Sequence, residues 1–162
     1  MAPTAGFRLR KRRPMNAART AALTACVAAG VVVADQVTKA IVRSEISRFE
    51  EHELFAGIKL INTRNTGVAF SMFSGGGPLV VIIAFIALGA LLAFFLTHLH
   101  TRLVWLPTGL LLGGAAGNLI DRIRIGAVTD FIKFPHWPAF NVADICVTFG
   151  VISLIYVLER VK

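Results

Sequence analysis

Long apolar stretches bounded by polar residues divide most of the chain into candidate helices. Residues 78–96 and 103–120 carry no charged side chain, and two further apolar runs, at 20–34 and 145–158, extend through polar residues to similar lengths. An α-helix rises about 1.5 Å per residue, so about 20 residues cross a hydrocarbon core of about 30 Å. The pattern predicts four transmembrane helices, at about 20–42, 78–97, 103–122 and 141–158.

The segment between the first two predicted helices, residues 44–77, has a different character. Its beginning is polar, and apolar residues then return in two short runs, 54–61 and 68–73, on either side of NTRNTG at 62–67. Such runs around Asn, Thr and Gly favour short strands joined by a turn. Glycines at 75–77 favour a flexible link into the second helix. The predicted fold class is an all-α membrane protein: a four-transmembrane-helix bundle with a small β-like extramembrane platform between helices one and two.

Composition and charge agree with a membrane protein. The 162 residues are 56% hydrophobic and only 16% charged, with a mean hydropathy of +0.70, and a soluble domain carries more charge than this. Basic residues are densest in residues 1–19, and others lie between helices two and three and at the C-terminus. The positive-inside rule makes this side cytoplasmic. We therefore expect both termini in the cytoplasm, a basic extension over 1–19 and one membrane domain over 20–162.

The net charge of +8 has two possible explanations. Basic patches mark many nucleic-acid-binding proteins, but these residues abut a hydrophobic helix. Topology and attraction to membrane lipids explain them better, and we expect no nucleic-acid partner.

The N-terminus also resembles a cleavable secretion signal. Basic residues precede an apolar run, and LTAC at 23–26 is similar to a lipoprotein-processing box. However, only residues 17–22 lie before the box and Arg19 interrupts them, so an apolar region of the usual length is missing. We expect a retained first helix.

Polar residues collect at the predicted outer ends of the first and third helices. Asp35 and Lys39 are four residues apart and can pair on one helix face, as a structural ion pair or as support for a site. Asn118 and Arg122 share a face of the third helix, although Arg122 can instead extend to the headgroups. Glycines that permit close helix packing recur every four residues in that helix, at Gly109, Gly113 and Gly117, and Asp121 continues the stripe.

Two aspartates at the outer face are the main candidates for chemistry. Asp130 lies in VTDF at 128–131, where the chain returns to that face, and Asp144 lies in FNVAD at 140–144, in the first turn of the fourth helix. Carboxylates are costly near lipid, so such a pair indicates a functional site. Asn141 can face the same way as Asp144 or simply cap the helix.

The pair predicts aspartyl-protease chemistry. Two close carboxylates hold one proton between them, so one activates water as a base and the other donates a proton, and the roles can exchange. This chemistry needs no metal or cofactor, and the four histidines form no HExxH motif. We therefore expect neither.

Five motifs in order make the chain resemble the lipoprotein signal peptidase (signal peptidase II) family of the bacterial cytoplasmic membrane. They are DQVTK at 35–39, NTGVAFS at 65–71, GGAAGNLIDR at 113–122, VTDF at 128–131 and FNVAD at 140–144. The resemblance implies an intramembrane aspartyl endopeptidase that removes signal peptides from prolipoproteins whose cysteine carries a diacylglyceryl group. It also implies an active site near the outer face of the inner membrane and inhibition by globomycin-like cyclic peptides. We expect a monomer.

The resemblance also implies roles for individual residues. Asp130 and Asp144 are the expected catalytic aspartates. The expected supporting or substrate-binding residues, to which we add Lys39 as the partner of Asp35, are Asp35, Asn65, Gly114, Asn118, Arg122 and Asn141.

Two other classes are weighed against this interpretation. A small transporter or channel subunit places its carboxylates near the middle of the bilayer, in broken helices, whereas these lie at helix ends. A serine–lysine signal peptidase has only Ser44 or Ser71 with Lys39 as candidates, and neither serine lies in a convincing motif.

Overall fold

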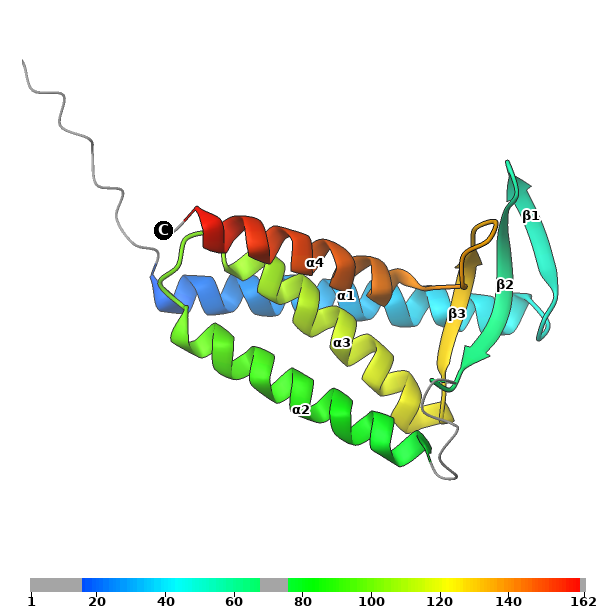
Figure 1. Ribbon diagram of the computed structural model, residues 1–162, viewed down its shortest axis with the longest axis horizontal. Helices are drawn as coiled ribbons and strands as arrows, with labels where there is room; N and C mark the ends of the chain where they lie inside the picture. Colours follow the sequence, from blue (N-terminus) through cyan, green and yellow to red (C-terminus); the bar gives the residue numbers. More distant parts are fainter. Residues whose placement is uncertain (1–15, 68–75, 161–162) are drawn as a thin grey trace, which may run out of the picture.

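The computed structural model describes residues 16–67 and 76–160. Four long helices run along one direction, and a small sheet lies across one end of them (Figure 1). In chain order the elements are α1 (Ala17–Glu45), β1 (Glu51–Phe55), β2 (Ile58–Asn65), α2 (Gly76–Thr97), α3 (Trp105–Ile125), β3 (Val128–Lys133) and α4 (Val142–Glu159).

The four predicted helices are present, with shifted ends. α1 is longer than 20–42 at both ends. It begins at Ala17 because Asn16 caps it and accepts a hydrogen bond from the Ala18 amide at 3.0 Å. Residues 17–19 of the predicted extension are therefore helical, and the earlier ones lie outside the described residues. α2 already begins at Gly76, so most of the predicted glycine link is helix.

Within the described residues, three helices are long and apolar enough to cross a membrane: Ala17–Glu45, Pro78–Thr97 and Val142–Glu159. α3 is not among them, because glycines and several polar residues near its end lower its hydropathy. The prediction of four crossings is thus supported for three helices, and a crossing by α3 stays a prediction.

α3 lies among the other helices, and its glycines allow close contact on two faces. A Cβ atom at Gly113 would lie 2.7 Å from the Ala28 carbonyl oxygen of α1, and one at Gly114 would lie 2.6 Å from the Ala143 carbonyl oxygen of α4. The predicted glycine stripe therefore faces α1, while Gly114 lies against α4. This packing fixes where the polar end of α3 lies relative to both neighbours.

The platform is a three-stranded antiparallel sheet in the order β1-β2-β3. The predicted turn at 62–67 is wrong, since β2 runs through Asn65 and the hairpin turns at Ala56 and Gly57, which both have positive φ. Residues 58–65 stay extended because they pair with strands on both sides. The second predicted run, 68–73, lies outside the described residues.

The third strand corrects the fold class and the source of the platform. β3 comes from the connection between α3 and α4, which the sequence interpretation treated as an irregular return, and it contains Asp130. The protein is thus mostly helical with a small sheet, not all-α, and the sheet is not built only from residues 44–77. Apolar packing joins this sheet to α1 through Val42, Ile46 and Phe131.

Salt bridges tie the three strands together across one face of the sheet. The Glu51 carboxylate of β1 contacts Lys59 of β2 at 2.8 Å and Lys133 of β3 at 2.6 Å. Hydrogen bonds from these two ammonium groups lower the pKa of Glu51 to about 2.

Candidate active site

Asp130 is held by hydrogen bonds from two sides, on an edge strand of the platform. It lies on β3 opposite Thr63 of β2, and it is 2% exposed. Asn65 Nδ2 donates to Asp130 Oδ2 at 3.0 Å, and Asn141 Nδ2 donates to Oδ1 at 2.7 Å. The Asn65 amide is oriented because its Oδ1 accepts from the Gly67 amide at 2.9 Å.

Asp144 is positioned by the start of α4. Asn141 Oδ1 accepts from the Asp144 amide at 3.0 Å, and Asp144 Oδ2 accepts from the Asn141 amide at 3.1 Å, which forms a reciprocal capping box. Asn118 Nδ2 of α3 donates to Asp144 Oδ1 at 2.8 Å. The capping role considered for Asn141 is therefore found, and the same residue contacts Asp130.

The surroundings of Asp130 favour its protonated form more than water does. Burial raises the pKa of Asp130 to about 6, and the negative charge of Asp144 acts in the same direction. Hydrogen bonds from Asn65 and Asn141 oppose this rise because they stabilise the carboxylate. An aspartate whose pKa is raised to about 6, beside a second aspartate, is suited to proton transfer.

A buried ionic cluster supports the site from α1 and α3. The Lys39 side chain is fully buried, and its Nζ lies 2.9 Å from Asp35 Oδ2 and 3.4 Å from Asp121 Oδ2. The predicted pairing of Asp35 with Lys39 is confirmed. Buried charges are stable only when they are paired and hydrogen-bonded, so removing one member leaves the others uncompensated.

Lys39 also determines how the Asn118 amide points. Lys39 Nζ donates to Asn118 Oδ1 at 2.8 Å, and Asn141 Nδ2 donates to the same oxygen at 3.1 Å. With its oxygen held by two donors, Asn118 presents its amide nitrogen to Asp144. One chain of contacts thus leads from the buried ammonium to an acidic oxygen at the site.

Asp35 connects this cluster to α4. Its Oδ1 accepts from the Ala143 amide, in the first turn of α4, at 3.0 Å, and a carboxylate is favoured at a helix N-terminus. A Cβ atom at Gly117 would lie 2.5 Å from Asp35 Oδ2, so only glycine leaves room for the carboxylate. Asp35 therefore positions the helix that carries Asp144.

The predicted set omitted four residues that belong to this network. Asp121 Oδ2 accepts from the Thr129 amide at 2.9 Å, Arg43 Nη1 donates to Thr129 Oγ1 at 3.0 Å, and Gln36 Nε2 donates to Asp121 Oδ1 at 3.2 Å. Asp121 was detectable, because it continues the glycine stripe, and Gln36 lies inside DQVTK. Thr129 likewise lies inside VTDF, whereas Arg43 carried no such signal, since its contact with Thr129 depends on the position of β3.

Among the predicted supporting residues, Arg122 and Gly114 bond neither to the two carboxylates nor to the buried ionic cluster in the described part of the chain. Arg122 Nη1 donates to the Asn118 carbonyl oxygen at 3.4 Å, and its side chain borders a cavity of about 440 Å³ that is also lined by residues of α2. Gly114 acts through packing, as described above. Both lie beside the site rather than in it.

A groove opens beside Asp144. It has a volume of about 300 Å³, and its walls come from the start of α4 and the loop before it: Trp137, Phe140, Asp144, Ile145, Thr148 and Phe149. Apart from Asp144 and Thr148 the walls are apolar. An apolar ligand in this groove would lie next to an acidic oxygen.

The structure also bears on two alternatives, a serine–lysine pair and a metal site. Ser44 Oγ donates to the Ile41 carbonyl oxygen at 2.9 Å, while Lys39 is occupied by Asp35, Asp121 and Asn118, so no serine–lysine pair forms among the described residues. Ser71 lies outside them. Over 16–67 and 76–160, no group of three or more His, Cys, Asp or Glu side chains is placed to hold a metal ion.

Comparisons with known proteins agree on one family. The family profile described as signal peptidase (SPase) II matches residues 27–159. The chain is 38% identical over 131 residues to the lipoprotein signal peptidase of Anaplasma marginale (strain Florida), covering 77% of each chain. It is 42% identical over 137 residues to that of Symbiobacterium thermophilum, covering 80% of this chain and 89% of the relative.

A solved structure shares the fold. It is described as a bacterial membrane enzyme, and it superposes with a TM-score of 0.79 at 32% identity, covering 92% of this chain and 97% of its own.

Proposed function

The chain belongs to the signal peptidase II family of lipoprotein signal peptidases, and from this premise we propose that Asp130 and Asp144 form its catalytic dyad. The family is one of proteases that act on lipoproteins, and the apolar helices make this member a multi-pass membrane protein. The observation that carries the proposal is the position of Asn141, which bonds to both carboxylates and so places them at one site.

The proposed reaction is hydrolysis of a peptide bond by an activated water. One carboxylate removes a proton from water, which attacks the peptide carbonyl carbon, and the other donates a proton that reaches the leaving nitrogen. The carbon–nitrogen bond breaks and two peptides leave, so the dyad regains its starting charge after the protons redistribute. No other reactant is needed.

We assign the proton to Asp130 when the pair holds one proton. Burial raises its pKa to about 6, and an apolar substrate that excludes more water raises it further, because desolvation disfavours the carboxylate. Asp144 then acts as the base, with both oxygens accepting hydrogen bonds, from Asn118 and from the Asn141 amide. This assignment gives each aspartate one role for the first step.

We propose that the substrate is a prolipoprotein whose cysteine carries a diacylglyceryl group. The lipid-facing helices leave large apolar side chains exposed, such as Ile86 at 66% and Phe149 at 61%. Acyl chains anchored against such surfaces hold the scissile bond at a set depth, next to the groove at Asp144. Globomycin-like cyclic peptides are expected to compete there. A monomer contains every residue of the proposed dyad.

The same reasoning supports the proposed membrane orientation. α3 is 21 residues long and lies among three helices of spanning length, with its polar end at the sheet (Figure 1). We propose that α3 is the fourth crossing, that residues 20–162 act as one domain, and that both termini are cytoplasmic in a bacterial inner membrane. The sheet and the dyad then lie near the outer face.

The test is cleavage of a diacylglyceryl-modified prolipoprotein by the purified protein in detergent. Asp130→Asn and Asp144→Asn each keep the shape of the side chain but remove the titrating group, so each is expected to lower turnover by about 10²-fold or more. Glu53→Gln is the matched control, because it removes an exposed carboxylate of the same platform.

The control is expected to cleave at the wild-type rate, and all variants are checked for folding by thermal unfolding. Full turnover in either aspartate variant would remove that residue from the dyad. Inhibition by serine-directed reagents, rather than by globomycin-like peptides, would favour a serine–lysine mechanism.

A further inference from the structure

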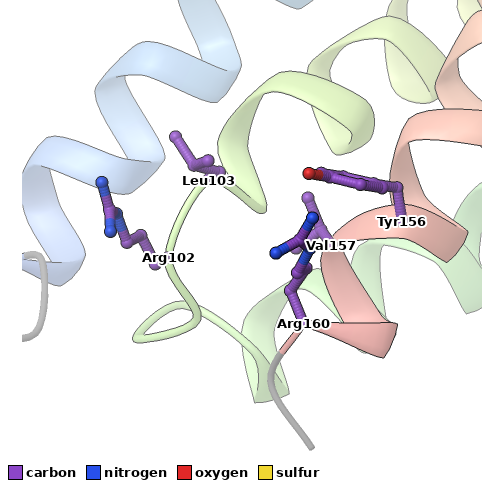
Figure 2. A pocket seen from close by; sticks show the side chains of 5 residues that line it. All are labelled: Arg102, Leu103, Tyr156, Val157 and Arg160. Atoms are coloured by element: carbon purple, nitrogen blue, oxygen red, sulfur yellow. The ribbon is translucent and has the colours of Figure 1, made fainter.

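A second cavity lies at the opposite end of the bundle from the two aspartates. It has a volume of about 330 Å³, and its walls come from the α2–α3 connection and the end of α4 (Figure 2). The lining residues are Arg102, Leu103, Tyr156, Val157 and Arg160. The catalytic proposal uses none of them.

The cavity combines two cations with a phenol. The Arg160 guanidinium lies over the Tyr156 ring, 5.0 Å from its centroid, and the Tyr156 hydroxyl points across the opening (Figure 2). Arg102 lies on the other side of the opening, and its exposed guanidinium is directed away from Tyr156 and Arg160 (Figure 2), so it would contact a bound phosphate after a change of rotamer. Within residues 16–67 and 76–160 neither arginine forms an ion pair, and Glu159 does not line the cavity. Guanidinium groups and a hydroxyl are donors that suit a phosphate.

Apolar surface adjoins this polar opening. Leu103 is 46% exposed at its rim, and Ile152 and Ile155 on the same helix as Tyr156 are 59% and 53% exposed. A free phosphate ion makes no favourable contact with such an apolar surface, whereas the acyl chains of a phospholipid can pack along it. The combination favours a lipid as the source of the phosphate.

We propose that this cavity binds the phosphate of an anionic phospholipid headgroup. The ends of α2 and α4 and the starts of α1 and α3 lie together here (Figure 1), and in the proposed orientation they meet the cytoplasmic leaflet, which is rich in anionic lipid. Basic pockets between transmembrane helices on that side recognise such headgroups. The inference rests on the proposed orientation, and it does not depend on the peptidase reaction.

The test is native mass spectrometry of the full chain released from nanodiscs of phosphatidylglycerol or of phosphatidylcholine. The wild type is expected to retain phosphatidylglycerol in preference to phosphatidylcholine. Arg102→Gln and Arg160→Gln are each expected to weaken retention roughly fivefold, since each removes one cation near the headgroups. The double variant should lose the preference, while Arg102→Lys/Arg160→Lys should keep most of it.

Arg19→Gln is the matched control. It removes an exposed cation from the same end of the molecule, in the first turn of α1, but Arg19 does not line the cavity, so retention should stay at the wild-type level. Equal retention by the wild type and the double variant would overturn the proposal, and so would equal losses in Arg19→Gln. Displacement of the lipid by millimolar inorganic phosphate would show a site for the free anion instead.

Peptidase turnover separates this inference from the proposed function. The double variant is expected to cleave prolipoprotein in detergent at the wild-type rate. Lost lipid preference with normal cleavage supports the headgroup site, whereas inactive wild-type protein contradicts only the catalytic proposal.

Discussion

Asn141 has more roles than any other residue at the site. Its side-chain oxygen caps α4, its side-chain nitrogen donates to Asp130 and to Asn118, and its backbone amide donates to Asp144. A substitution there therefore removes a helix cap and a bridge between the carboxylates together. Asn118 is similar, because it links the buried Lys39 ammonium to Asp144. Asparagine suits both positions because its amide carries a donor and an acceptor together.

The proton assignment predicts the pH dependence of cleavage. If Asp130 must be protonated, kcat/KM falls as pH rises through its pKa, about 6 in the free enzyme, because the reactive form is lost by ionisation. The corresponding fall in kcat, the alkaline limb of its pH profile, should occur at higher pH, because bound substrate excludes water and so raises the Asp130 pKa. A pH–rate profile of prolipoprotein cleavage measures both limbs. Activity that rises with pH through this range would instead make Asp130 the base.

Asn65 provides a variant that should move this limb. Its hydrogen bond to Asp130 lowers the pKa of that carboxyl, so Asn65→Ala is expected to raise the Asp130 pKa and to shift the alkaline limb of kcat/KM to higher pH. A purely structural role would lower the rate without moving the limb. Asn62→Ala is a suitable control, because Asn62 lies on the same strand but bonds to the Ile46 carbonyl oxygen.

At the scale of elements, the contact between α3 and α4 sets the distance between Asn118 and Asp144. Gly114→Ala would place a methyl group 2.6 Å from the Ala143 carbonyl oxygen and 2.8 Å from Val147 Cγ2, so the helices must separate. We expect a loss of about 2 kcal/mol in the free energy of unfolding, typical of overpacking. Cleavage should fall as well, because Asp144 lies on the helix that moves.

Gly89→Ala is the matched control for this prediction. Gly89 lies on α2, and a Cβ atom there would meet nothing within 4 Å. Alanine is the better helix former by about 1 kcal/mol, so this variant should be unchanged or more stable. Thermal unfolding in detergent compares the two, and equal stability would show that α3 and α4 tolerate a wider separation.

The strands are the elements that the local sequence pattern predicted least well. NTRNTG at 62–67 looks like a turn, but pairing of residues 63–65 with β3 keeps them extended and places Asn65 beside Asp130. β3 itself is short, and its first four residues are buried, so it shows no alternation of polar and apolar positions. The wrong turn and the missed strand β3 both depend on pairing between residues far apart in the chain, which a local sequence pattern does not contain.

At the scale of the whole molecule, the membrane setting predicts dependence on the substrate's lipid. Acyl chains that are bound away from the reacting bond contribute binding energy that positions it. We expect the unlipidated precursor to have a kcat/KM lower by about 10²-fold or more. Parallel assays of the two precursors with the same peptide sequence measure this. Equal cleavage of both forms would mean that the peptide alone positions the bond.

The sequence alone predicted the helical membrane architecture, and its motifs contain the two aspartates and the three asparagines that bond to them in the structure. The length of an apolar run identifies a membrane helix from neighbouring residues alone, and motif residues such as Asp130 and Asn141 are recognisable without coordinates. The tertiary structure alone decided that β3 completes the sheet, that Asp121 and Arg43 hold Thr129, and that Asn141 joins both aspartates. These contacts link residues from different helices and strands, so they exist only once the elements have packed together.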